Sequence, residues 1–193
     1  MIYTSVLTSL TNLDTLYLDS LLLDSPLGTH EETLKAYRIL EGYVMQKKVR
    51  HLGISNVSLP KLERLYDECH VKPSIVQNRF WASNKWDVGV RRFCRDHGMV
   101  WQSFWTRNPQ LLKTALVQRV AEGVLGNGDR KEEALNLLVL VLGRGWWEGG
   151  GVAILYGATR EAAMKSDLEA AVRVGAASIG ERMEFSRLVG EDD

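Results

Sequence analysis

Residues 48–56 read KVRHLGISN, a stretch that takes the chain from a helix into a short strand. The lysine that opens it is a cation of the kind that favours the last turn of a helix. Residues 51–55 then have the length and apolar content of a short buried strand. Ser58 is a typical residue to begin the next helix, with Pro60 in its first turn. The stretch therefore predicts a helix, a strand and a second helix in succession.

Upstream, residues 16–23 form a nearly continuous apolar run that stops at Asp24-Ser25-Pro26. Such a run suits a strand that is buried on both faces. Thr29 and Glu32 have the spacing of a capping box, in which each side chain hydrogen bonds the backbone of the other residue. We expect a helix to begin there, because apolar residues follow at helical spacing: Leu34, Tyr37, Leu40 and Val44.

Downstream, strand and helix patterns continue to alternate. Further strands are predicted at residues 74–77, 99–104 and 151–156. A helix is predicted at residues 87–98, with Asp87 as its cap and Gly98 as its left-handed terminator. Further helices are predicted from Asn108-Pro109 through Val120, at residues 129–142, from Thr159 onward, and at residues 178–188. The helix from Thr159 is expected to turn an apolar face inward, made of Met164, Leu168, Ala171 and Val172.

This alternation predicts an α/β fold with a parallel sheet and helices outside it. Five strands are visible in the pattern. Periodicity alone leaves open whether the sheet is an open doubly wound one or part of a (β/α) barrel.

Composition narrows the classes of function. The 193 residues include 24 Lys plus Arg, 24 Asp plus Glu and two Cys. The balanced charge argues against a nucleic-acid partner, because broad phosphate neutralisation needs a basic excess. Two cysteines exclude a disulfide scaffold and a four-cysteine zinc site, and they fit the reducing cytosol.

The apolar N-terminal stretch does not have the pattern of a signal peptide. It has no basic region, and Asp14, Asp19 and Asp24 interrupt it. No run in the chain reaches ~18 uninterrupted apolar residues, the length that a membrane-spanning helix needs. We therefore expect a soluble, cytoplasmic protein with no membrane partner.

Five segments stand out in order along the chain: YLDSLLLDSP at 17–26, KVRHLGISN at 48–56, KPSIVQN at 72–78, GMVWQSF at 98–104, and LYGAT at 155–159 with MKSDL at 164–168. Together they resemble the landmarks of strands 4 to 8 in the aldo-keto reductases, fungal-type members of that family in particular. The resemblance covers roughly residues 10 to 175, and the segment from about 125 to 151 is unlike the family.

The resemblance implies a partial (β/α)8 TIM barrel, strands 4 to 8 with their helices, as a single domain over residues 1–193. A complete barrel takes about 250 residues, so we expect the N-terminal part of the barrel to be lacking. The first and last strands would then be unpaired edges, which invite pairing with another chain. We therefore expect self-association through the strand edges.

The same resemblance implies an oxidoreductase that uses NADP or NAD to interconvert carbonyl and alcohol groups of small molecules. It implies that Ser55, Asn56 and Gln77 hydrogen bond the nicotinamide carboxamide, because hydroxyl and amide groups both donate and accept. It also implies that Phe104 stacks on the nicotinamide ring, as the family's usual tyrosine does. Trp105 and Ala163 stand where the family often has phosphate contacts, so selectivity for NADP is not expected.

The family's proton-donating residues are not matched. Its catalytic histidine falls at the end of strand 4, where this chain has Asp24, and its Asp, Tyr and Lys belong to segments upstream of Met1. An aspartate is ionised at neutral pH and repels a developing alkoxide. We therefore expect impaired or absent reduction. The alternatives are a catalytically inactive protein that binds a cofactor or partner, and a truncated gene product.

Each candidate residue also has a purely structural interpretation. Ser55 and Asn56 could end a strand and begin a turn, Gln77 could be an ordinary satisfied polar residue, Phe104 could belong to the core, and Asp24 could cap a strand. No metal site is expected, because the Cys–His pairs near residues 69 and 94 lack a second matched pair. The glycine-rich segment 143–151, with Trp146 and Trp147, is either a contact surface or a loop folded back on the domain.

Overall fold

The computed structural model describes residues 2–143, 150–157 and 159–191. The strand order is β1-β2-β3-β4-β5, with parallel pairing of β1 with β2, β2 with β3 and β4 with β5. The strands are β1 Leu18–Leu23, β2 Val49–Ser55, β3 Ile75–Arg79, β4 Val100–Phe104 and β5 Gly151–Ile154. The predicted α/β fold and all five predicted strands are therefore confirmed.

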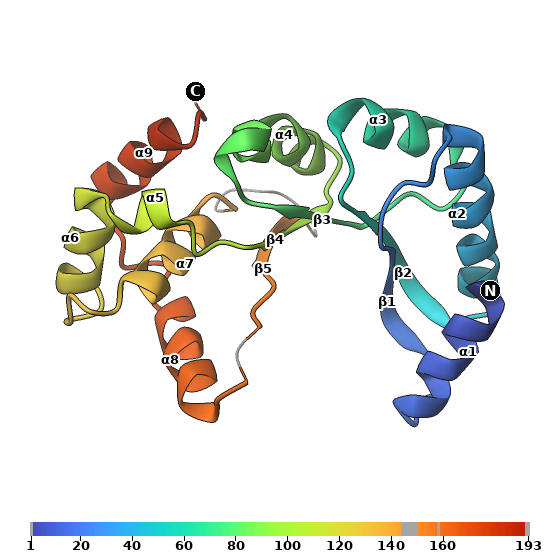
Figure 1. Cartoon of the computed structure of the whole chain (residues 1–193), viewed down its shortest axis with the longest axis horizontal. Helices are drawn as coiled ribbons and strands as arrows, with labels where there is room; N and C mark the ends of the chain where they lie inside the picture. The colour runs from blue at the N-terminus through green and yellow to red at the C-terminus, as the bar shows by residue number, and fades with distance from the viewer. Residues whose placement is uncertain (1, 144–149, 158, 192–193) are drawn as a thin grey trace. The chain divides into compact units, whose positions relative to one another are not determined.

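Helices connect and flank these strands (Figure 1). They are α1 Ile2–Asn12, α2 His30–Met45, α3 Leu59–Glu68, α4 Val88–Asp96, α5 Pro109–Leu112, α6 Ala115–Gly123, α7 Lys131–Val141, α8 Glu161–Ala171 and α9 Ile179–Leu188, with a 3₁₀ segment, η1, at Ala82–Asp87. The chain contacts divide these elements into two compact units, and the division falls within β3, after Gln77.

In the first unit, α2 begins at the predicted capping box. The Thr29 side chain accepts a hydrogen bond from the Glu32 backbone N–H, and the Glu32 carboxylate accepts one from the Thr29 N–H at 3.0 Å. The helix packs on β2 and α3 and buries Tyr37 and Leu40. Gly53 is required in β2, because a Cβ there would lie 2.4 Å from the backbone oxygen of Ile75 on β3.

In the second unit, α7 is the central helix. It contacts α5, α6, α8, α9 and β5, and it is buried along most of its length. A second cluster of the core is aromatic, with Phe80 lying 5.9 Å from Trp101 and 6.4 Å from Phe185, measured between ring centroids. Gly98 ends α4 with a φ of 66°, the left-handed conformation that was predicted for it.

Two burial predictions are wrong. No residue of β1 is buried, although residues 16–23 were predicted to be a strand buried on both faces. Among the described strands β1 is hydrogen-bonded to β2 alone, so one edge and part of each face lack cover. The predicted inward face of α8 is exposed as well, at 69% for Leu168 and 83% for Val172.

Polar docking explains the orientation of α8. Arg130, next to the start of α7, donates to the backbone oxygen and to the hydroxyl of Ser166, and Asn136 of α7 donates to Asp167 at 3.0 Å. The polar side of α8 therefore faces α7, and its apolar side faces away. Figure 1 shows α8 beside α7.

Three local predictions also differ from the structure. The helix predicted from Asn108 to Val120 is broken into α5 and α6, because Thr114 accepts from the Val117 N–H and begins a new helix. Asp87 precedes α4 as predicted, but its carboxylate makes no capping hydrogen bond. No helix or strand was predicted for residues 2–12, which form α1.

Trp146 and Trp147 lie outside the described residues. No helix in the described part of the chain is long and apolar enough to cross a membrane.

Candidate functional site

The polar residues predicted from the sequence come together in the first unit, at the carboxyl ends of β1 and β2 and beside Gln77 of β3. Ser55 is paired in register with Gln77. The Ser55 hydroxyl is buried and donates a 2.8 Å hydrogen bond to the Gln77 backbone oxygen, and it lies 3.5 Å from Oε1 of the Gln77 side chain. Parallel strands place their carboxyl ends on one edge, so these side chains share a small polar surface.

Asn56 joins this surface to the end of β1. Its backbone has a φ of 53°, a left-handed conformation that asparagine tolerates better than most residues. Its N–H donates to the Gln77 oxygen at 3.0 Å, and its side-chain Nδ2 donates to the Asp24 backbone oxygen at 2.9 Å. Asp24 is exposed and directly follows β1. The structure therefore brings Asp24, Ser55, Asn56 and Gln77 together.

This polar surface has the chemistry to orient an amide. The Ser55 hydroxyl retains acceptor lone pairs after donating its proton, and Asn56 retains its side-chain carbonyl oxygen. Gln77 is half-buried at the end of the same strand pair. A primary carboxamide, with two donors and one acceptor, matches this set of groups.

A cavity of about 510 Å³ lies in the second unit, at the carboxyl ends of β4 and β5. Half of its lining residues are aromatic, and the lining consists of Trp81, Phe104, Trp105, Thr106, Arg107, Leu155, Tyr156 and Gly157. The predicted residue Phe104 is half-buried in this lining. The rings of Trp81 and Trp105 meet edge to face, with centroids 5.9 Å apart. The cavity is of the size and composition typical of small-molecule sites.

The one cation of the lining, Arg107, is held by acidic partners. Its Nη1 lies 2.5 Å from Oε2 of Glu132, and its Nη2 lies 3.4 Å from Oδ2 of Asp167 and donates to the Tyr156 hydroxyl. A hydrogen bond to Asp167 raises the pKa of Tyr156, and the guanidinium partly offsets this increase. Arg107 therefore braces the wall of the cavity, and two carboxylates share its charge there.

Sequence reasoning missed Trp81, Arg107 and Tyr156 as cavity residues. Arg107 and Trp81 each lie two or three residues beyond the end of a strand, and such positions line the site in a barrel. That position was the signal that could have identified them. Ala163, the position expected to lack a phosphate-binding cation, is half-buried on α8.

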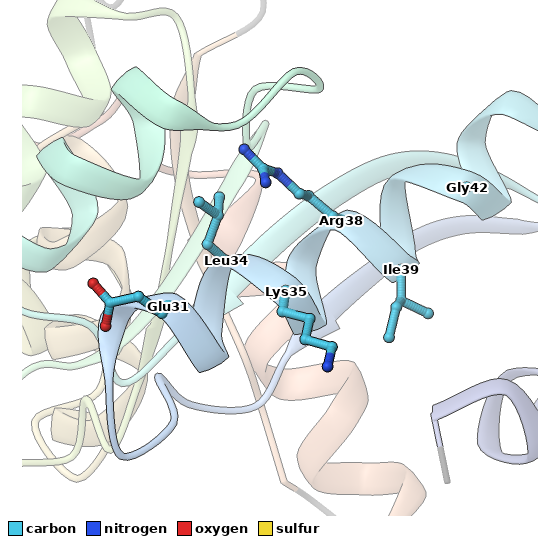
Figure 2. A pocket seen from close by; sticks show the side chains of 6 residues that line it. All are labelled: Glu31, Leu34, Lys35, Arg38, Ile39 and Gly42. Carbon is cyan, nitrogen blue, oxygen red and sulfur yellow. The ribbon is translucent and has the colours of Figure 1, made fainter.

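A second depression lies on the outer side of α2 in the first unit, with a volume of about 580 Å³. All six lining residues belong to this one helix. Figure 2 shows Leu34 and Arg38 pointing to one side of the helix and Lys35 and Ile39 to the other. The side chains diverge, so the depression has no converging groups that could hold a ligand.

The two cysteines do not form a reactive or metal-binding site. Cys69 and Cys94 are both free and buried. Burial raises the pKa of the Cys69 thiol to about 11, and it raises the pKa of Cys94 as well. Among the described residues, no three His, Cys, Asp or Glu side chains lie close enough together to bind a metal ion.

The comparisons with known proteins agree with this geometry. A family model described as "Aldo/keto reductase family" matches residues 1–106. The NADPH-dependent alpha-keto amide reductase of Saccharomyces cerevisiae is 27% identical over 113 residues, which cover 55% of this chain and 36% of the yeast protein. The chain thus spans about a third of the length of this curated relative.

Solved structures match over nearly the whole chain. The aldo/keto reductase of Brucella melitensis superposes with a TM-score of 0.77 at 17% identity, covering 97% of this chain and 67% of that protein. The aldose reductase of Giardia lamblia gives a TM-score of 0.72 at 16% identity, covering 97% and 66%. These matches confirm that the fold corresponds to part of a (β/α)8 barrel.

Proposed function

The chain belongs to the aldo/keto reductase family, and on this premise we propose that it is a nicotinamide-dependent oxidoreductase domain for small carbonyl and alcohol compounds. The observation that carries the proposal is the polar edge of the first unit. Ser55 and Gln77 are paired in register there, and Asn56 is tied to the same Gln77 oxygen. These three residues would hold the carboxamide of the nicotinamide and so set which face of the ring is presented.

Phe104 is the proposed stacking residue for the nicotinamide ring. It is half-buried in the wall of an aromatic cavity, where a flat ring finds hydrophobic contact without a hydrogen-bonding group. When bound, the cofactor would supply the hydride; the protein contributes binding and orientation.

We further propose that turnover is slow, because Asp24 stands where a proton donor is expected. Asp24 is exposed at the end of β1, and only its backbone oxygen accepts the Asn56 side chain. A carboxylate at that place would repel the negative charge that develops on the alkoxide. The second candidate function therefore retains the same nicotinamide site but lacks turnover, so that the chain binds a cofactor or partner without reducing a substrate.

Binding and turnover are tested separately. NADPH and NADH are titrated while tryptophan fluorescence is followed, and a broad panel of aldehydes is then assayed for reduction. We expect saturable binding that Gln77→Ala weakens about tenfold, as the loss of one hydrogen bond predicts. Gln110→Ala, an exposed glutamine on α5, is the matched control and should leave binding unchanged.

The results discriminate between the two functions. Slow reduction that Asp24→His accelerates supports the oxidoreductase, whereas binding without reduction in either protein supports the second candidate. If neither nucleotide binds, both functions are wrong. If Gln77→Ala binds as tightly as the parent, the assigned carboxamide site is wrong.

The proposed partners follow from the same reasoning. We propose a small carbonyl compound as substrate and no nucleic-acid partner, in line with the equal counts of acidic and basic residues. The two free, buried thiols fit a location in the cytoplasm. The uncovered edge of β1 is the proposed surface for self-association, and sedimentation over a range of protein concentrations tests it.

A further inference from the structure

Arg79 places a guanidinium over the aromatic wall of the cavity in the second unit. Its Cζ lies 4.1 Å from the ring centroid of Trp105 and 5.8 Å from that of Phe104. Both rings belong to the cavity lining. A cation stacked on these rings therefore sits at the rim of the cavity, held there by attraction to the aromatic faces.

The charge of Arg79 is available to a ligand. The side chain is exposed, and no acidic side chain in the described part of the protein forms an ion pair with it. Arg107, the cation in the cavity lining, differs in this respect because Glu132 and Asp167 both pair with it. A stacked guanidinium keeps its N–H edge free, and that edge matches the two oxygens of a carboxylate.

The backbone at Trp105 helps to present this pair. Trp105 has a φ of 59°, an uncommon conformation for a bulky residue, and its side chain is 59% exposed. The indole thus forms an outer wall whose face is covered by Arg79 and whose ring meets Trp81 edge to face. Arg79 therefore lies beside the aromatic part of the cavity lining.

The charges of Arg79, Arg107 and the partners of Arg107 also limit the net charge and the orientation of a ligand. Arg107 and its two carboxylate partners together carry a net charge of about −1, so a second anionic group is disfavoured next to them. A cationic ligand is disfavoured by Arg79 itself. We propose that the cavity binds a planar aromatic group with a single anionic substituent, a carboxylate that pairs with Arg79 while the ring packs among Trp81, Phe104 and Trp105.

Because the ligand would pack against Phe104, the residue proposed to stack on the nicotinamide ring, the two rings would exclude one another from the cavity. The proposal still goes beyond the proposed function, because binding of the aromatic carboxylate in the absence of nucleotide requires neither cofactor binding nor reduction. Its test uses 2-naphthoate and its neutral analogue 2-naphthamide, titrated into the whole chain by calorimetry without nucleotide. We expect the carboxylate to bind about tenfold more tightly than the amide, and the difference to shrink when salt rises from about 50 mM to about 500 mM.

Variants separate the charge from the stacking. Arg79→Gln should remove the preference for the carboxylate and leave the affinity for the amide within about twofold. Trp105→Ala should weaken both compounds, since it removes the ring that both compounds pack against. Arg95→Gln, an exposed arginine that pairs with Asp96 outside the cavity, is the matched control and should behave like the parent.

The proposal is overturned if naphthoate does not bind, if the amide binds equally well, or if Arg79→Gln keeps the preference. NADPH is titrated into the same variants to distinguish the source of the anion. If Arg79→Gln weakens NADPH about tenfold and leaves naphthoate unchanged, Arg79 serves nucleotide phosphates and the aromatic carboxylate site is wrong. Because the naphthoate arm contains no cofactor, its failure is distinguishable from a failure of the proposed function.

Discussion

The indole nitrogen Nε1 of Trp101 donates a hydrogen bond to Oδ2 of Asp87 across 2.8 Å, and both side chains are buried. Asp87 ends η1, where the backbone is left-handed at three consecutive residues, Lys85, Trp86 and Asp87. Arg91 donates from Nε to the Trp86 backbone oxygen at 3.0 Å. One buried carboxylate and one buried guanidinium therefore hold the segment that follows cavity residue Trp81.

We expect Asp87 to make stability depend on pH. Burial raises its pKa to about 6, and the hydrogen bonds from Trp101 and Asn78 and the charge of Arg91 only partly oppose the increase. The folded state therefore binds the proton more tightly than the unfolded state does. The contribution of Asp87 to the unfolding free energy therefore rises as pH falls through about 6. It levels off below the ordinary aspartate pKa, where it reaches about 3 kcal/mol at most.

Urea unfolding at several pH values checks this prediction. Asp87→Asn keeps an acceptor for Trp101 but has no charge, so it lacks this contribution. The difference in unfolding free energy between parent and variant should change between about pH 7.5 and about pH 5, with the parent gaining stability relative to the variant as pH falls. A difference that stays constant over this range contradicts the assignment.

Glu191 is predicted to be the main ionic anchor of the C-terminal segment. It pairs with Arg91, whose side chain is fully buried and has an Nη2 with no hydrogen-bond partner among the described residues. Glu191→Gln leaves the buried guanidinium without its charged partner and should lower the unfolding free energy by about 3 kcal/mol.

The control is Glu184→Gln. Glu184 also pairs with an arginine, Arg119, but both of these side chains are about half exposed. An exposed pair contributes about 0–1 kcal/mol, so this variant should unfold close to the parent. Equal effects of the two variants would show that burial of Arg91 does not set the strength of its ion pair.

Glu41 is predicted to hold the loop that leads into β3. Its buried carboxylate accepts hydrogen bonds from the backbone N–H groups of His70 at 2.7 Å and Val71 at 2.9 Å. Glu41→Ala leaves both donors unsatisfied and should cost about 3 kcal/mol, whereas Glu41→Gln retains an acceptor oxygen and should cost about half as much. Thermal and urea unfolding of the two variants measure the difference, and equal losses would contradict the role of the acceptor oxygen.

Leu168 is predicted to tolerate a charge. It is 69% exposed on α8, so Leu168→Lys should change the unfolding free energy by no more than about 0.5 kcal/mol. The matched change on the neighbouring helix, Leu138→Lys, buries an unpaired ammonium group and should abolish folding. If Leu168→Lys is also severely destabilising, the face of α8 that contains Leu168 is buried, as the sequence predicted, and the orientation seen in the structure is wrong.

Local patterns predicted the elements whose causes are themselves local. The capping box of Thr29 and Glu32 and the left-handed Gly98 depend on contacts within one turn of chain, and both are present. The Ser178 capping box at the start of α9 forms in the same way. The predicted strands also occur, because in an α/β fold a short apolar run between two helices is buried as a strand of the sheet.

The candidate site was predicted in part for the same reason. Ser55 ends β2, Asn56 follows it, and parallel pairing places Gln77 of β3 in register with Ser55. The roles of Arg79 and Arg107 could not be predicted, because each depends on partners distant in the sequence. Trp105 lies 26 residues after Arg79, and Asp167 lies 60 residues after Arg107.

The sequence by itself determined the five strands, most of the helices between them, and the capping box of α2, since these follow from propensities and from hydrogen bonds between near neighbours. Tertiary structure alone decided which faces are buried. On α8 the hydrogen bonds of Ser166 and Asp167 to α7 outweighed the apolar stripe, so that Leu168 faces away from that helix. Burial depends on the surface that a distant element presents, and helical periodicity contains no information about that surface.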